Sequence, residues 1–334
     1  MARSAPPRVA TWTALVVVLA ITSVAALLTG DGSLDDPLLR DTFLRLRGWR
    51  LATAMLAGGA LSVAGVLVQG LFRNPLASPS ILGTTAGASL GGVTTLLLWT
   101  TLLASHLPDW LPAELVLPAG CLAGAWGALA VLLAVTGRRA GVVTVLLTGF
   151  ILTSFFLSIG GLLTSIAQET YALGRAVVAF TLGGVDSKGP RHVALALPMV
   201  LGGFGAALAW GRHLDALLAG EDEATALGVD VPRTRRWIII WTATLTGAAV
   251  AISGAVGFVG LVVPHALRPL VGVSHRRLLP AALVGGATFV AACDVLTRII
   301  PAKGVIPLGV VTGLIGGPVF LVLLARAARE GRLG

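Results

Sequence analysis

Apolar residues fill this chain in runs of about 20 positions, and short polar or charged segments separate the runs. A helix of about 20 apolar residues crosses the hydrocarbon core of a bilayer, and these runs lack the period-two alternation of a membrane barrel. The pattern therefore predicts an all-α, polytopic membrane protein. Ten transmembrane helices are expected, at about residues 11–29, 51–71, 81–104, 113–135, 142–167, 192–210, 237–254, 258–272, 278–299 and 305–325.

One boundary in this series depends on a turn. An unbroken helix over 237–272 would be about 54 Å long at about 1.5 Å per residue, which is too long for one crossing. The string SGAVGFVG at 253–260 supplies glycines for a tight turn. We therefore expect a break near Gly254–Gly257.

Composition agrees with a single transmembrane domain over 1–334. Of the 334 residues, 56% are hydrophobic and 12% are charged, which excludes an ordinary soluble domain. The 43 glycines suit close approach of helices in lipid. The net charge of +9 is spread over short loops and follows the positive-inside rule, so no nucleic-acid partner is expected.

Ten spans place both termini on the same side of the membrane. If that side is the cytoplasm, the inside segments hold 14 Lys and Arg residues and the outside segments hold 9, while Arg268 lies within a helix. This excess supports cytoplasmic termini. The outside arginines at 40–50 oppose the trend and call for a function.

A charged segment at 211–236, GRHLDALLAGEDEATALGVDVPRTRR, interrupts the apolar runs. A membrane protein keeps such a polar insert where water or a protein partner receives it. Its string EDEATALG predicts a short helix, because carboxylates in a first turn favour the helix dipole and Gly228 can take a left-handed cap. This segment is the best candidate for contact with a soluble partner.

Several chemistries are missing from the sequence. There is no phosphate-binding G-x-x-x-x-G-K-[ST] loop, H-E-x-x-H or G-x-S-x-G, so neither ATP hydrolysis by this chain nor a cofactor is expected. Cys121 and Cys293 lie in apolar runs and are predicted to be small buried side chains rather than metal ligands. Apart from Glu114, at the very start of the 113–135 span, Asp294 is the one acid within a span, and this scarcity argues against a proton- or sodium-coupled carrier.

Four ordered segments carry the most specific patterns in the chain: RGWRLATAMLAGGALSVAGVLVQGLFRNPLASPSILGTTAGASLG (47–91), LLAGEDEATALGVDVPRTR (217–235), SGAVGFVGLVVPHALRPLVGVSHRRLLP (253–280) and CDVLTRIIPAKGVIPLGVVTGLIGGPVFLVLL (293–324). Together they resemble the FecCD-type permeases, the membrane subunits of binding-protein-dependent ABC importers for iron chelates, haem and cobalamin. The resemblance implies a type II, cobalamin-importer-like fold in the bacterial plasma membrane. It also implies a dimer around a translocation path, a cytoplasmic ABC ATPase and an extracytoplasmic substrate-binding protein.

The resemblance assigns the charged segment to ATPase coupling. The expected coupling residues are Glu221, Asp222, Glu223, Ala224, Leu227 and Gly228. A solvated loop without a partner is the alternative.

Three outside arginines, Arg47, Arg50 and Arg298, are assigned to docking of the binding protein, although GW stands here where the family has LP between the first two. The alternative for Arg298 is an ion pair with Asp294 four residues earlier, and snorkelling to lipid headgroups is the alternative for all three.

The fifth and tenth helices are expected to line the path. Thr144, Thr148, Ser154 and Ser158 form a mildly polar stripe on the fifth helix. The alternative is hydrogen bonding within or between helices.

Gate or structural positions near the cytoplasmic side are Gln69, Asn74, Pro75, Pro264 and His265. His265 has no second His or Cys at ligand spacing, so no metal site is expected.

The sequence thus predicts the permease subunit of an ABC importer, with a ferric siderophore as cargo and haem or cobalamin as alternatives. A secondary carrier without an ATPase is the alternative of another class, and an intramembrane enzyme lacks a nucleophile–base pair. The second permease is either another copy of this chain or a sister subunit, and membrane lipid surrounds both.

Overall fold

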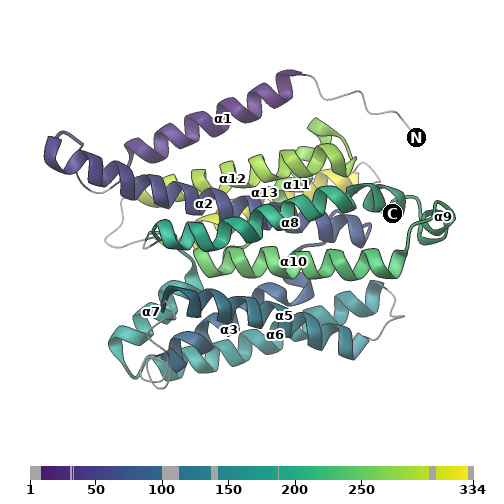
Figure 1. Ribbon diagram of the computed structural model, residues 1–334, viewed down its shortest axis with the longest axis horizontal. Coiled ribbons are helices and arrows are strands. Elements are labelled where there is room, and N and C mark those ends of the chain that lie inside the picture. Colours follow the sequence, from purple (N-terminus) through teal and green to yellow (C-terminus); the bar gives the residue numbers. More distant parts are fainter. Residues whose placement is uncertain are drawn as a thin grey trace.

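The computed structural model describes residues 9–329 except 31, 33, 100–112, 137–141, 187 and 301–305, and every regular element in this part of the chain is a helix (Figure 1). The helices are α1 (Val9–Leu28), α2 (Pro37–Leu71), α3 (Thr84–Leu98), α5 (Val116–Thr136), α6 (Val142–Ala167), α7 (Tyr171–Leu182), α8 (Pro190–Leu217), α9 (Glu221–Ala226), α10 (Val231–Ser253), α11 (Val259–Val271), α12 (His275–Ile299) and α13 (Leu308–Arg329), with short 3-10 turns η1 (Pro79–Leu82) and η3 (Ala113–Leu115).

The ten predicted spans are confirmed as helices, and the fold is all-α and polytopic. Among the described residues, seven helices are long and apolar enough to cross a membrane, whereas α3, α7, α11 and the Leu308–Val322 part of α13 are shorter apolar helices. The predicted break is also confirmed, because α10 ends at Ser253 and α11 begins at Val259. Gly254 has a φ of +65°, and a Cβ there would lie 2.2 Å from the carbonyl oxygen of Phe180, so the turn requires glycine.

Three predicted boundaries were wrong for a shared reason. The helix expected from residue 51 begins at Pro37, with Asp36 as N-cap accepting a hydrogen bond from the backbone N–H of Leu38 at 2.9 Å. The helix expected to end at residue 210 continues to Leu217, and the helix expected from residue 237 begins at Val231. In each place charged residues end the apolar run but not the helix, and an Asp N-cap before the helix was the local signal for the two earlier starts.

The short helix α7 was not predicted. It has 12 residues, fewer than a crossing needs, and therefore gave no transmembrane signal. In Figure 1 it lies at the opposite end of the bundle from α9.

Helix α2 lies at the centre of the bundle. It packs against α8, α10, α11 and α12, and most of its second half is buried. Helix α10 also packs against α3 and α5. It therefore lies between α2 and a second layer made of α3, α5 and α6 (Figure 1). Helix α1 covers α12 and α2 from outside and exposes most of its apolar surface.

The contacts of α2 are made through glycine. A Cβ on Gly58 would lie 2.1 Å from the carbonyl oxygen of Gly286 in α12, and one on Gly65 would lie 1.9 Å from that of Gly260 in α11. Lipid removes the hydrophobic drive for helix association, so packing at such short backbone separations contributes much of the attraction. The 43 glycines predicted such contacts in general, but not which helices they join.

Substitution of Gly286 tests this packing. We expect Gly286→Ala to lower the free energy of unfolding by about 1–3 kcal/mol, because the added methyl group forces α12 away from α2. Unfolding in detergent micelles measures the effect. The control is Gly161→Ala on α6, where a Cβ meets no atom within 4 Å; equal stability of the two variants would contradict the close contact.

Candidate functional site

Helix α9 stands at one end of the bundle, between α8 and α10 (Figure 1). Glu221, Asp222 and Glu223 occupy its first turn, as the sequence predicted, and place negative charge at the positive end of the helix. Arg235 of α10 donates a hydrogen bond to Glu221 at 2.7 Å. The start of α1 lies at this same end of the bundle.

Glycine ends α9 as predicted. Gly228 has a φ of +83°, its N–H donates to the carbonyl of Thr225 at 2.9 Å, and the N–H of Val229 donates to that of Ala224 at 3.0 Å. These two bonds form a Schellman motif, which satisfies the last carbonyls of a helix. Residues 221–229 therefore form a short helix with a regular C-terminal cap.

One face of α9 packs against the bundle and the other is exposed. Ala224 is fully buried in the main apolar cluster, whereas Leu227 is 73% exposed and the acidic first turn is also exposed. A leucine exposed beside three carboxylates offers an apolar anchor with a polar rim, as at protein interfaces.

At the opposite end, Arg47 caps the last turn of α1. Its guanidinium donates to the carbonyls of Leu27, Leu28, Gly30 and Gly32 at 2.9–3.2 Å, and the residue is only 6% exposed. These carbonyls have no partner within α1, so the arginine supplies what the helix end lacks. No local pattern in the sequence predicted this cap.

Arg50 and Arg298 converge on Asp294, whose side chain is 2% exposed. Arg50 makes a two-pronged contact, with Nη2 at 2.7 Å and Nε at 2.9 Å from Oδ1 of Asp294. The ion pair between Arg298 and Asp294, weighed as one alternative for Arg298, is present. Arg298 also donates to the carbonyls of Ala26 and Thr29.

The docking role of the three arginines therefore stays a prediction, because each side chain already has acceptors within this chain. Arg50 is the most accessible, with its side chain 19% exposed and Nη2 3.5 Å from the half-exposed carboxylate of Asp186. Asp186 was not identified from the sequence, since it lies 136 positions from Arg50 and neighbours no motif.

The connection between α7 and α8 closes this end of the bundle. The N–H of Gly184 donates to the carbonyl of Ser253 at 2.8 Å, and the N–H of Leu308 donates to that of Gly183 at 3.0 Å. The segment thereby joins the end of α10 to the start of α13. Burial lowers the pKa of Lys188 in this connection, and the nearby Asp186 opposes the shift.

The expected path residues lie on α6, which is largely exposed. Ser154 and Ser158 donate to the carbonyls of Phe150 and Ser154 at 3.2 and 2.9 Å, the back-bonding that was weighed as the alternative. Thr144 is exposed and Thr148 is partly exposed on the same helix. A role in lining a path stays a prediction for all four.

The side chain of Gln69 compensates for the N–H that Pro264 lacks. Both residues were predicted only as gate or structural positions. A proline at 264 has no N–H to donate to the carbonyl of Gly260, four residues earlier. The side-chain amide of Gln69 lies 3.4 Å from that carbonyl and 3.4 Å from that of Leu261. The glutamine therefore supplies a donor from α2 where α11 lacks one.

Asn74 and Pro75 form the predicted turn after α2. The side chain of Asn74 accepts a hydrogen bond from the backbone N–H of Leu76 at 2.9 Å, and the chain then turns back into the bundle through η1. His265 is partly buried in α11, and the described residues hold no group of three His, Cys, Asp or Glu side chains suited to a metal ion.

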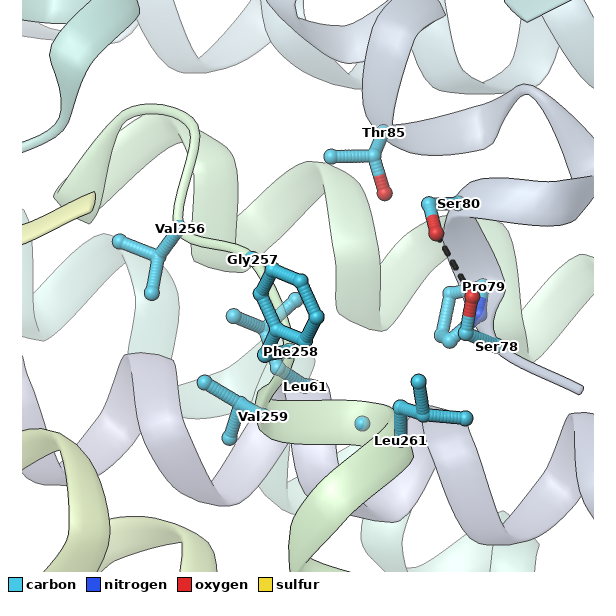
Figure 2. A pocket seen from close by; sticks show the side chains of 11 residues that line it. Leu61, Ser78, Pro79, Ser80, Thr85, Val256, Gly257, Phe258, Val259 and Leu261 are labelled. Carbon is cyan, nitrogen blue, oxygen red and sulfur yellow. Dashed lines mark hydrogen bonds between the residues drawn. The ribbon is translucent and has the colours of Figure 1, made fainter. Parts of the chain in front are cut away.

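A cavity of about 190 Å³ lies where α11 begins (Figure 2). Leu61, the Ser78–Ser80 segment, Thr85 and the chain from Val256 to Leu261 line it, and Phe258 points its ring among them. Phe258 has a φ of +66°, a strained value for a bulky residue. The cavity is smaller than the roughly 300 Å³ of the smallest usual ligand pockets.

A match to known families decides the identity. The family model described as the FecCD transport family matches residues 9–326. The chain belongs to the FecCD family.

Relatives of this FecCD permease include the Fe(3+) dicitrate transport system permease protein FecD of Escherichia coli, 38% identical over 83% of each chain. The cobalamin import system permease protein BtuC of Halobacterium salinarum is 35% identical over 82% of this chain and 71% of its own. A solved inward-facing structure of a putative metal-chelate type ABC transporter has a TM-score of 0.82 and 30% identity, covering 94% of this chain and 98% of its own.

These findings confirm the resemblance and the fold class predicted from the sequence. The protein is a multi-pass membrane permease of the ABC importer type, a transport component.

Loss of the carboxylate at 294 tests the arginine cluster of this permease. We expect Asp294→Ala to reduce the free energy of unfolding by about 3–5 kcal/mol, because it leaves Arg50 and Arg298 without their shared anion in a largely buried place. Unfolding in detergent micelles measures it. The control Glu169→Gln removes an exposed carboxylate and should leave stability unchanged; an equally stable Asp294→Ala protein would contradict a structural role for the cluster.

Proposed function

We propose that this chain is the membrane subunit of a bacterial importer for ferric siderophores, driven by ATP that a separate ATPase subunit hydrolyses. Both termini face the cytoplasm in this proposal, and α9 lies on the same side. Residues 211–236 act as the coupling loop within the single transmembrane domain 1–334.

The observation that carries the proposal is the form of α9. It is a capped, six-residue helix fixed to the bundle through Ala224, with Leu227 and three carboxylates turned outward. A loose loop would absorb the motion of a partner, whereas a short helix with a defined cap transmits it. Glu221, Asp222, Glu223, Ala224, Leu227 and Gly228 are the proposed coupling residues.

The proposed cargo is a ferric siderophore. The relative FecD is named for ferric dicitrate, which favours a ferric chelate, and BtuC is named for cobalamin. Cobalamin, and haem from the family resemblance, are the alternatives within the same mechanism. A ferric chelate carries its own ligands around the metal, and the permease then needs no metal site. The weakly polar stripe of Thr144, Thr148, Ser154 and Ser158 suits a path that must release its cargo.

A second permease, either another copy of this chain or a sister subunit, completes the path. Large apolar side chains remain exposed on α6 and α13, among them Leu147, Phe150 and Phe155 on the first and Leu314 and Leu321 on the second. We propose that the two permeases meet over these helices, with lipid covering α1 and the rest of the outer surface.

Reconstitution of the complete transporter tests this function. Proteoliposomes holding the permease with its ATPase and binding protein are supplied in turn with ferrichrome, ferric citrate, haem and cyanocobalamin. We expect ATP-dependent uptake of a ferric chelate, and loss of that uptake when residues 224–227 are replaced by a Gly/Ser linker in a protein that still folds. The wild type without ATP is the control for passive leakage.

Three outcomes would redirect the proposal. Uptake of only haem or cyanocobalamin would change the cargo. Gradient-driven uptake by the permease alone would favour the secondary carrier. Normal uptake with the Gly/Ser linker would remove the coupling role from α9.

Docking of the binding protein is proposed at the opposite end, through Arg47, Arg50 and Arg298. Arg47 and Arg298 would have to exchange carbonyl acceptors for carboxylates of the partner, while Arg50 is already partly exposed beside Asp186. Arg40 and Arg45 are exposed on the first turns of α2 and offer a second possible surface.

Neutralising single arginines separates these two surfaces. We expect Arg50→Gln to weaken capture of the binding protein about 10-fold at low salt and less at high salt, because the lost attraction is electrostatic. Arg45→Gln is the matched control on the same helix. Arg50→Lys keeps the charge and should largely restore binding even though it loses the two-pronged contact with Asp294. Weakening by Arg45→Gln alone would move docking to the exposed turns of α2.

A further inference from the structure

A carboxylate near the end of α8 caps a different helix. Asp215 accepts a hydrogen bond from the hydroxyl of Ser274 at 3.0 Å and from the backbone N–H of His275 at 2.8 Å, and it shares a 2.6 Å hydrogen bond with Nδ1 of His275. These residues are about 60 positions apart in the sequence, so the contact joins two separate elements.

The position of Asp215 explains its effect on α12. Ser274 is the N-cap residue of α12, but its side chain makes no capping bond within that helix. The first N–H groups of a helix need acceptors, and negative charge is stabilising there. Asp215 supplies both, so the start of α12 is tied to the end of α8.

His275 extends the contact to a third helix. Its side chain is buried, the residue being 1% exposed, and a Cβ on Gly70 would lie 2.4 Å from its Nε2 atom. Gly70 belongs to the last turn of α2, just before the Asn74–Pro75 turn. The imidazole is thus wedged between α8 and α2, and three helix ends meet at one point.

Asp215 itself lies within the coupling loop of residues 211–236, just before its short helix α9. Asp215 stands six residues before Glu221, the first residue of α9, and α9 packs against both α8 and α10. At its other end α12 carries Asp294, the centre of the arginine cluster. A 25-residue helix therefore runs from the Asp215–His275 contact to the proposed docking end.

We propose that Asp215 is a positioning residue for transport, which passes displacement of α9 and the end of α8 to α12 through Ser274 and His275. The proposal rests on the coupling function assigned above to α9. Without the carboxylate, the end of α8 moves without carrying α12, and ATP hydrolysis continues with less cargo moved.

The test uses the complete transporter in proteoliposomes and the cargo that the four-compound comparison identifies. Cargo molecules moved per ATP hydrolysed and the unfolding temperature are both measured for Asp215→Asn and Asp215→Ala. We expect the ratio to fall about 10-fold or more, as for a lost allosteric coupling, while binding-protein-stimulated ATP hydrolysis stays within about two-fold.

Two further variants examine the same contact from α12. His275→Asn keeps an N–H donor near the position of Nδ1 and should retain most of the ratio, whereas His275→Leu should lose it. Asp36→Asn is the matched control, because this carboxylate caps its own helix at the far end of the bundle. It should not change the ratio.

An unchanged ratio in both Asp215 variants would overturn the proposal, as would losses of ATP hydrolysis, uptake and unfolding temperature in proportion, which indicate a purely structural role. Failure of the proposed function is a different result. The wild type would then show no ATP-dependent uptake, or the Gly/Ser linker in place of 224–227 would leave uptake intact.

Discussion

The close contact between α2 and α12 sets the geometry on which the rest of the molecule depends. Gly58 and Gly286 bring the two backbones together near the middle of the pair. That separation lets Arg50 reach Asp294 at one end and places Gly70 against His275 at the other. All three contacts therefore depend on the distance between α2 and α12. They are the glycine contact at the middle, the ion pair at one end and the contact of the imidazole at the other. A methyl group at the central level would therefore disturb both ends, because two packed helices respond as rigid bodies.

The second constraint is that lipid supplies no hydrogen bonds to an irregular backbone. Two of the breaks between described helices, from α2 to α3 and from α10 to α11, lie inside the bundle. Neighbouring elements donate to carbonyls at both: the N–H of Gly184 donates to the carbonyl of Ser253 at 2.8 Å, and Thr153 of α6 donates to that of Ser80 at 2.9 Å. The small cavity with Phe258 lies between these two breaks. The breaks therefore lie where protein, rather than lipid, surrounds them, and they give the bundle short elements that can move without opening a long helix.

Much of the fold could be read from the sequence, because a bilayer imposes one length and one polarity on each span. The break at Gly254 and the capped helix before Gly228 followed from local rules as well. Long-range pairing could not be read in the same way. Asp215 and His275 are ordinary charged residues at the edges of apolar runs, and only the packing of α8 against α12 brings them together. The cap that Arg47 forms on α1 was hidden for the same reason, because its carbonyl acceptors lie 15 to 20 positions earlier in the chain.

Asymmetry between the two ends of α12 suggests how an importer can use this arrangement. The Asp215 end contains directed hydrogen bonds around a buried imidazole, which hold one geometry and transmit displacement. The Asp294 end contains a carboxylate shared by two arginines, with Asp186 3.5 Å from Arg50 as a further acceptor. An arginine between two carboxylates can exchange partners at little cost, because one ion pair replaces another. A displacement that begins at α9 would therefore reach the rigid contact between Asp215 and His275 first. It would reach the adaptable contact between Arg50 and Asp294 last. This order suits the proposed function, in which an ATPase acts on α9 and a binding protein is released at the opposite end.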